Sequence, residues 1–236
     1  MKVKVKKIPK GATIIEGFPG FGLVGTITTE FLINHLEMKE IGSLVLKNQE
    51  AMVALHEGKL IKPITFYHNK KYNIVVVHSI APGKGREWDI SGVILEIATK
   101  AEAKQIISIE GVMSQTPDSP DQNVFYYTNE PKFVKTLEKN NLKALKEGII
   151  VGVTAAMLAQ NGHKFVSVLA ETHSQLPDSR AAANVIKALD AYLGLKVDPE
   201  PLMHQAELFE AKVKGLVEKS SKVTQQQKEK QISYVG

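Results

Sequence analysis

Apolar runs with the composition of buried strands alternate along the chain with segments of helical periodicity. Thr13–Gly17 and Gln105–Val112 are such runs, and the continuous run Val75–Val77 suits a central strand covered on both faces. Between them, apolar residues recur every three or four positions, as in Leu23–Leu36. The alternation predicts an α/β fold with a helix-covered, largely parallel or mixed sheet. Four successive strand-like segments, 43–47, 51–55, 60–67 and 72–79, predict some antiparallel pairing.

Several helix starts are marked by single residues. Asp89 is a candidate N-cap, and Asp178 begins a helix whose apolar residues fall on one side. Pro131 suits the first turn of another helix, where its missing N–H costs nothing. The apolar run Ile149–Val153 leads through Thr154 into a short helix.

Composition excludes several classes of protein. The 236 residues are 43% hydrophobic, which is enough for a core and excludes wholesale disorder. Without cysteine the chain has no disulfide framework and no Cys-ligated zinc site. The N-terminus lacks the apolar run of a signal peptide, and no run of about 18 apolar residues predicts a membrane span. We expect a cytoplasmic protein without a membrane partner.

Positive charge is concentrated at the two ends. Residues 1–10 carry a net charge of +5 and residues 212–236 carry +4, whereas the body between them carries −4. Lysine-rich ends could bind nucleic acid through phosphate neutralisation. Only two arginines occur, however, and aromatic residues are not interleaved with the lysines. We therefore interpret the ends as solvated and expect no nucleic-acid partner, keeping a nucleic-acid binder as a third hypothesis.

The pattern changes after residue 197. Apolar or small residues are spaced by four and three in turn, which is a two-position heptad seam: Leu202, Ala206, Phe209, Val213, Leu216, Ser220 and Val223. So narrow a seam needs a second helix. The partner is either a copy of the same helix or the chain's own domain, and the seam favours a homo-oligomer, which we expect to be a tetramer or pentamer.

The last residues become apolar again after a polar stretch. Ile232, Tyr234, Val235 and Gly236 lie where nothing nearby in the sequence can bury them, which suggests a peptide that binds a partner. We expect three units: a globular α/β domain at 1–197, an oligomerising helix that protrudes at 198–224, and a flexible basic tail at 225–236.

A glycine-rich turn joins the first buried strand to the first helix. Gly20, Gly22 and Gly25 match G-x-G-x-x-G, the pattern of a dinucleotide site, and Glu50 follows where a ribose-binding acid would lie. The neighbouring phenylalanines offer a pyrophosphate neither donors nor charge. Gly17 and Gly25 are explained equally well by a sharp turn and close helix–strand packing. We favour a structural glycine loop and keep a nucleotide-binding enzyme, an ATP-dependent ligase or NAD-type protein, as the alternative.

Other motifs predict no catalytic site. The loop Pro82–Arg86 is basic but lacks the spacing of a phosphate-binding P-loop. The seven histidines form no metal-binding pair at helical spacing, so we expect no metal. Glu171, His173 and Asp178 form either an acid–base set or a helix cap. We assign no catalytic residue and no cofactor.

The chain resembles the proteasome assembly chaperone family, in particular its archaeal members. The resemblance covers about residues 10–195 and lies in four segments: Ile15–Gly25, Gly148–Leu158, Val168–His173 and Leu176–Ala183. It implies a three-layer α/β/α domain of the phosphorylase/hydrolase-like type without established catalytic activity. It also implies that the partners are proteasome α-subunits or the core particle. Relatives have also been described as possible ATP-grasp ligases.

The resemblance also implies an oligomer with C-terminal tails. Proteasome activators end in a hydrophobic–tyrosine–any-residue motif whose carboxylate binds a pocket between α-subunits. Here Tyr234 is third from the end and Val235 is penultimate, so the match is offset by one residue. The resulting expectation is a non-enzymatic, homo-oligomeric chaperone that assists proteasome assembly or activation, partly through its tails.

Overall fold

The computed structural model describes most of the first 197 residues. The described ranges are 2–6, 8–45, 53–56, 58–113, 123–140, 142–160, 162–172 and 176–197. The expected oligomerising helix (198–224) and basic tail (225–236) lie outside them. In the described part, no helix is both long and apolar enough to cross a membrane.

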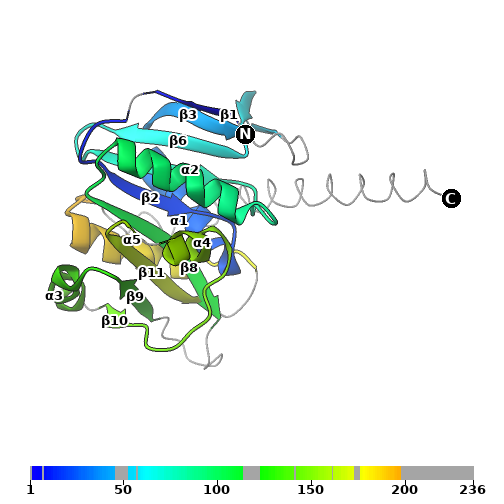
Figure 1. The fold of residues 1–236 in the computed structure, drawn as a ribbon. Coiled ribbons are helices and arrows are strands. Elements are labelled where there is room, and N and C mark those ends of the chain that lie inside the picture. Colours follow the sequence, from blue (N-terminus) through cyan, green and yellow to red (C-terminus); the bar gives the residue numbers. More distant parts are fainter. Residues whose placement is uncertain are drawn as a thin grey trace.

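A nine-stranded mixed sheet forms the centre of the molecule (Figure 1). Four mutually parallel strands, β7, β2, β8 and β11, occupy its middle, and antiparallel strands extend it on both sides. The predicted mixed sheet is therefore confirmed. In spatial order the strands are β1 (Lys2–Val5), β3 (Lys39–Val45), β6 (Ile64–Asn69), β7 (Ile74–Ser79), β2 (Thr13–Gly17), β8 (Gln105–Met113), β11 (Phe165–Thr172), β9 (Val124–Thr128) and β10 (Lys143–Ala144).

One expected strand is divided in two. Residues 60–67 were predicted as a single strand, but β5 (Lys59–Ile61) ends before Pro63 and β6 begins after it. Proline has no N–H to donate to a sheet ladder, which explains the break. β5 pairs instead with β4 (Ala54–His56) in a separate two-stranded sheet.

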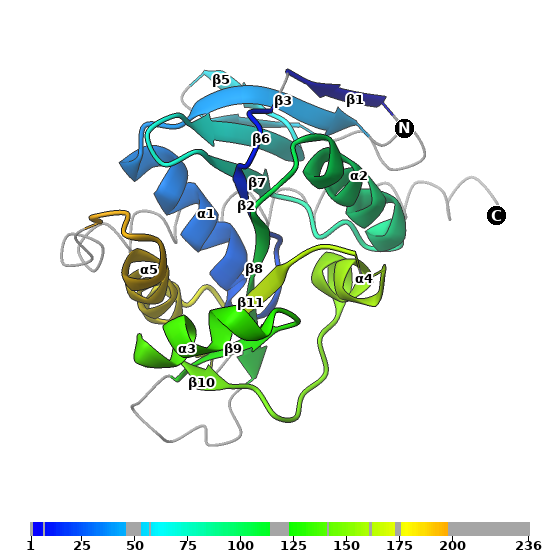
Figure 2. The same cartoon turned by 60° about the vertical axis from the view of Figure 1, so that its left-hand side comes forward.

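Helices cover both faces of the central sheet, as the three-layer prediction requires (Figure 2). The helices α1 (Val24–His35) and α5 (Ser179–Leu193) lie on one face. The short 3-10 helix η1 (Phe21–Leu23) directly precedes α1 in the chain. The other face carries α2 (Glu87–Lys100) and the short α4 (Gly152–Gln160). The remaining helix, α3 (Pro131–Lys139), lies beside β9 and β10.

Alternation along the strands divides the core into two layers. On β2, Ile14 packs into the cluster shared with α2 and α4, whereas Ile15 packs into the cluster shared with α1 and α5. Both side chains are fully buried. Because side chains alternate with a period of two, Glu16 points to the same face as Ile14. An acidic side chain is therefore directed into the layer under α4.

Two of the three predicted helix starts are confirmed. Asp178 accepts a hydrogen bond from the backbone N–H of Ala181 at 2.9 Å, as an N-cap does, and Pro131 opens α3. The N-cap prediction for Asp89 is wrong, because α2 already begins at Glu87 and Asp89 lies in its first turn. There Asp89 forms a 2.8 Å ion pair with Arg86, and an acid in a first turn also complements the helix dipole.

Candidate functional site

The glycine loop packs against the carboxyl ends of the central strands. A Cβ added to Gly17 would lie 2.2 Å from the carbonyl oxygen of Gly25, and one added to Gly25 would lie 2.5 Å from that of Ile109. Neither position can hold a side chain without moving backbone. Both contacts agree with the interpretation of these two glycines as helix–strand packing positions.

The middle of the loop is equally close to its neighbours. Gly22 has a φ of 61°, and its carbonyl oxygen accepts a hydrogen bond from the Asp178 N–H at 2.8 Å. A Cβ on Gly111 of β8 would lie 2.1 Å from the carbonyl oxygen of Phe21. The positive φ of Gly22 and the close approach of Phe21 to Gly111 therefore account for these two glycines without a bound phosphate. Glu50, the proposed ribose ligand, lies outside the described residues.

The other predicted binding residues also lie outside the described residues. These are the seam positions Leu202, Phe209, Val213, Leu216 and Val223, and the tail residues Ile232, Tyr234, Val235 and Gly236. The interactions of both sets remain predictions.

Glu171 and Asp178 have structural roles. Asp178 caps α5 and also accepts a hydrogen bond from the Thr172 hydroxyl at 3.0 Å. Glu171 accepts hydrogen bonds from the backbone N–H and the side-chain amide of Asn123. The cap interpretation is therefore confirmed for Asp178 alone, and His173 lies outside the described residues. Within the described ranges, no three His, Asp or Glu side chains are grouped as metal ligands would be.

Two carboxyl groups meet at one hydroxyl under α4. The Thr154 Oγ1 lies 2.7 Å from Glu16 Oε1 and 2.7 Å from Glu110 Oε1. Glu16 is the penultimate residue of β2, Glu110 lies near the end of the adjacent parallel strand β8, and Thr154 lies in the first turn of α4. Glu16 and Thr154 are fully buried. The cluster forms because the carboxyl ends of parallel strands share one edge of the sheet.

The number of hydrogens in this cluster limits how its two carboxyl groups can be protonated. A threonine hydroxyl has one hydrogen, so it donates to one carboxylate and must accept from the other carboxyl, which is then protonated. Burial raises the pKa of Glu110 to about 7. The pKa of Glu16 is also raised, first by burial and then by the negative charge of Glu110. The three side chains therefore hold a proton that an exposed pair of glutamates would release.

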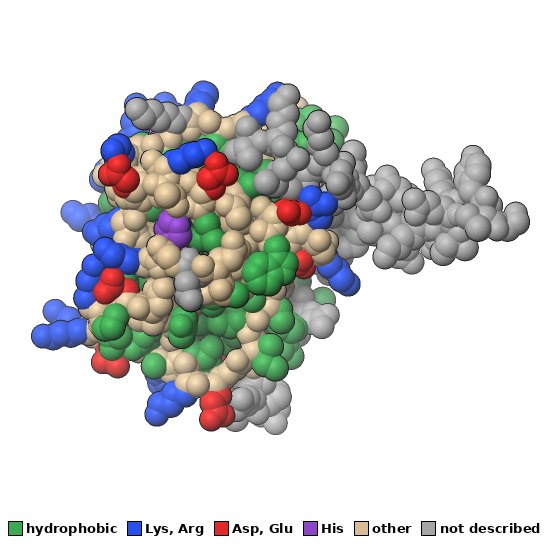
Figure 3. Space-filling model, viewed as in Figure 1, with side chains coloured by type: hydrophobic (Ala, Val, Ile, Leu, Met, Phe, Trp, Pro, Cys, Tyr) green, Lys and Arg blue, Asp and Glu red, His purple; other side chains and the backbone are tan. Residues whose placement is uncertain are grey.

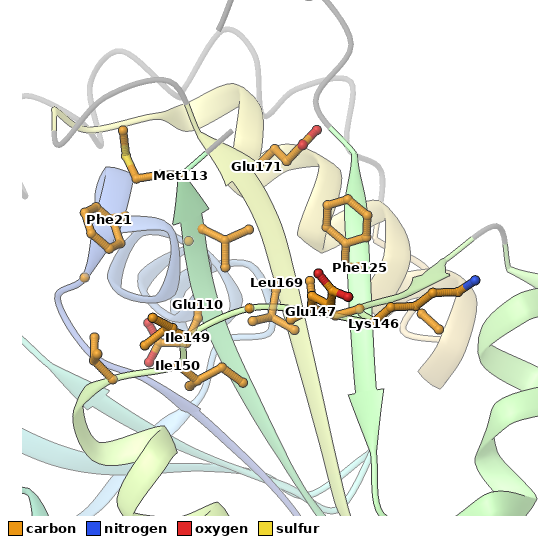
Figure 4. Close-up of a pocket in the computed structure, with 17 residues that line it drawn as sticks. Phe21, Glu110, Met113, Phe125, Lys146, Glu147, Ile149, Ile150, Leu169 and Glu171 are labelled. Carbon is orange, nitrogen blue, oxygen red and sulfur yellow. The ribbon is translucent and has the colours of Figure 1, made fainter. Parts of the chain in front are cut away.

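A cavity of about 1100 Å³ opens beside Glu110 (Figure 4). Its floor is formed by the ends of β8, β11 and β9, and Phe21 of the glycine loop forms one wall. The opposite wall is the segment 144–151, which joins β10 to α4. In Figure 4, Glu110 lies next to Ile149 and Ile150, at one end of the cavity. The parallel strands thus direct an acid into an open space.

The wall of the cavity is unusually apolar for a surface segment. The side chain of Ile149 is 90% exposed and that of Val151 is 62% exposed. The sequence predicts only that residues 149–153 lead into α4, and the structure adds that 149–151 form no helix or strand. Apolar side chains gather in the lower half of the face shown in Figure 3. Clustered exposed apolar groups mark binding surfaces more often than scattered ones do.

A second buried polar cluster lies under α1. The Thr29 Oγ1 donates to the Gly25 carbonyl oxygen at 2.8 Å and lies 2.9 Å from His78 Nδ1. The other ring nitrogen of His78 lies 3.3 Å from a Glu30 carboxylate oxygen. The direction of the Thr29 contact with His78, and of that between His78 and Glu30, depends on which ring nitrogens carry a proton. This cluster ties β7 to α1 and thereby supports the glycine loop.

Sequence reasoning missed Glu16, Glu110 and Thr154. A signal was present, because two apolar runs lead into the same pair of residues, Glu16-Gly17 and Glu110-Gly111. A carboxylate inside a buried strand needs a partner, and two such strands side by side provide a pair. Recognising it required the strand order, which places β2 next to β8.

Fold and site together define a three-layer α/β protein with a glycine loop and an acidic pocket at the carboxyl ends of its parallel strands. The chain belongs to the PAC2 family, whose model matches residues 14–217.

Solved structures and curated sequences agree with this assignment. The chain is 30% identical to Pyrococcus furiosus PbaA, an archaeal homolog of proteasome-assembly chaperone, with 94% of this chain and 99% of that chain covered and a TM-score of 0.83. It is 27% identical over 225 residues to the Methanocaldococcus jannaschii protein MJ0106, covering 94% and 92% of the two chains. P. furiosus PbaB, an archaeal proteasome activator, shares the fold at 21% identity, with 91% and 97% covered and a TM-score of 0.72.

Proposed function

We propose that the protein is a non-enzymatic, homo-oligomeric chaperone that binds proteasome α-subunits or the core particle and assists its assembly or activation. The observation that carries this proposal is the likeness to PbaA over nearly the full length of both chains. PAC2 membership over residues 14–217 supports it. A cytoplasmic location follows from such a partner.

Two features of the described site favour binding over catalysis. The acidic side chains near the glycine loop are held in hydrogen bonds that leave no obvious nucleophile: Thr154 bridges two carboxyls, and Asp178 caps a helix. Carboxylates next to the loop also oppose a phosphate group by charge repulsion. The charge around the loop therefore disfavours the nucleotide-binding alternative.

The C-terminal segments supply the contact with the partner in this proposal. The heptad seam joins copies of the chain, and each copy then carries one tail that ends in Ile232–Gly236. A tail of a few residues binds weakly by itself. Several tails on one oligomer raise the effective concentration, so that avidity can exceed single-site affinity by about 10²–10⁴.

Capture of proteasome α-subunits tests the function. Immobilised full-length protein is expected to retain α-subunits or assembled core particle, and a variant lacking residues 224–236 is expected to lose most of this capture at unchanged oligomer size. Tyr234→Ala should weaken capture, while Ser233→Ala serves as its matched control. Failure of the full-length protein to retain either form of the partner would overturn the chaperone proposal. Equal capture by the truncated protein would overturn only the role of the tail.

A further inference from the structure

The cavity beside Glu110 has no part in the proposed chaperone function. Its volume of about 1100 Å³ is slightly above the range of small-molecule sites, which are commonly about 300–1000 Å³. We propose that this cavity binds an organic cation, with a primary ammonium group on Glu110 and an apolar, preferably aromatic, body along the 145–151 wall. The inference rests on the cavity alone and stands or falls independently of any proteasome partner.

Charge in the cavity favours a cation. Three acidic residues line it, Glu110, Glu147 and Glu171, against one basic residue, Lys146. Figure 4 shows the Lys146 side chain pointing outward, away from Glu110. Buried Glu16, on the other side of the Thr154 hydroxyl, shares one proton with Glu110, so that the pair carries a single negative charge. A carboxylate or phosphate ligand would therefore meet like charge, while an ammonium group would find an acceptor.

One oxygen of Glu110 is free of the Thr154 contact. The hydroxyl lies against Oε1, so the second oxygen, Oε2, is the one directed toward Gly20. A Cβ on Gly20 would lie only 2.9 Å from this Oε2. Because Gly20 has no side chain, the approach to the oxygen stays open. An ammonium group donates up to three hydrogen bonds and matches such an acceptor.

The rest of the cavity suits an apolar body. Phe21 and Phe125 lie on different elements that bound it, and Ile150 adds to the hydrocarbon surface. Ile149, almost fully exposed, stands at the Glu110 end. A ligand that covers these side chains removes apolar surface from water, which favours binding by about 25 cal/mol per Å² in general. The site therefore selects a positive charge at its Glu110 end and an apolar body along the 145–151 wall.

Calorimetric titration with matched probes tests the proposal. Tryptamine carries an ammonium group on an aromatic body, and indole-3-propionate replaces that group with a carboxylate at similar size. Full-length protein at pH 7.5 is expected to bind one tryptamine per chain, with a Kd on the order of 1 mM or tighter. Indole-3-propionate should give no saturable heat.

Two variants locate the binding. Glu110→Gln keeps the shape of the side chain and removes its charge, so tryptamine affinity should fall by about tenfold or more. Gly20→Ala should abolish binding without unfolding the protein. Its φ of −141° is open to alanine, and the added methyl meets only the flexible end of Glu110. Gly92→Ala on α2, where an added Cβ meets nothing within 4 Å, is the control and should bind like wild type.

The outcomes separate clearly. Saturable binding of tryptamine that is lost in both site variants and kept in Gly92→Ala supports the proposal. The proposal is overturned if wild type shows no saturable heat, if indole-3-propionate binds as tightly, or if both variants bind tryptamine unchanged. Should Gly20→Ala fail to fold, the Glu110→Gln titration decides alone. None of these results bears on capture of α-subunits.

Discussion

The Cβ position of Gly17 lies 2.2 Å from the carbonyl oxygen of Gly25, so helix α1 rests directly on the backbone of strand β2. Real atoms cannot approach so closely, and any side chain at residue 17 must push α1 away from the sheet. We expect Gly17→Ala to destabilise the protein by several kcal/mol, in the range of overpacking changes that move backbone, which cost about 1–3 kcal/mol or more. Chemical denaturation monitored by circular dichroism measures the loss.

Gly92→Ala is the matched control for this prediction. Gly92 lies within α2, where an added Cβ meets no atom within 4 Å. Alanine is the better helix former by about 0.5–1 kcal/mol, so this variant should be slightly more stable than wild type. Equal effects of the two substitutions would show that α1 does not rest on Gly17.

The carboxyl cluster predicts a pH dependence of stability. The pKa of Glu110 rises from 4.5 to about 7 in the folded protein, and that of Glu16 is raised as well. The folded state therefore binds more protons than the unfolded state between about pH 4.5 and 7. Stability contributed by these groups is complete below pH 4.5 and is lost as the pH rises to about 7.

Comparison with Glu110→Gln isolates this contribution. Between pH 5 and 8 the unfolding free energy of wild type should fall relative to that of the variant by about 1–3 kcal/mol, since one pKa unit corresponds to about 1.4 kcal/mol. In a chain of this length that corresponds to about 2–4 °C in Tm for each kcal/mol. If Tm changed with pH in the same way for both proteins across this range, the result would contradict a proton shared by Glu16 and Glu110.

Two threonines provide a matched test of the His78 cluster. Thr29 and Thr99 each donate to the carbonyl four residues back and each touch a histidine ring, but Thr29 is buried and Thr99 is exposed. Thr29→Val removes the buried hydroxyl that contacts the His78 ring and should cost about 1–3 kcal/mol. Thr99→Val should change stability by no more than about 0.5 kcal/mol. Thermal unfolding distinguishes the two, and a harmless Thr29→Val would refute the tie between β7 and α1.

The heptad seam predicts an oligomer that a single seam substitution dissociates. Val213 occupies a seam position, and Ala211 falls on the opposite side of the same helical turn. Val213→Lys places a charge in the interface and should shift the mass in native mass spectrometry from oligomer to monomer. Ala211→Lys adds the same side chain outside the seam and should leave the mass unchanged. A wild-type monomer, or equal behaviour of both variants, would contradict the seam.

Much of the sheet could be predicted from local pattern. The alternation of Val3 and Val5 with lysine indicates a half-solvated strand, and β1 lies at the edge of the sheet, while the continuous run Val75–Val77 lies in fully buried β7. Capping chemistry predicted the start of α5 at Asp178. These features depend on neighbours in the sequence, which is why the sequence alone suffices for them.

The pocket could not be predicted in the same way. Glu16, Glu110 and Thr154 are separated by 138 residues from first to last, and only the crossover order of the strands brings them together. Residues 149–151 misled for a different reason: their apolar side chains indicate burial, yet they line an open cavity. A hydrophobic pattern indicates which residues tend to be buried. It does not identify the surface that covers them.

The position of β2 has a consequence for biosynthesis. This strand is among the first to leave the ribosome, yet its hydrogen-bonding neighbours are β7 and β8, which end at Ser79 and Met113. At a synthesis rate of about 5–20 residues per second, one edge of β2 stays unpaired for roughly 5–20 s until β8 has been made. Newly made chains of this protein are therefore most prone to aggregate before residue 113 has been translated, and they are themselves candidates for protection by other folding factors.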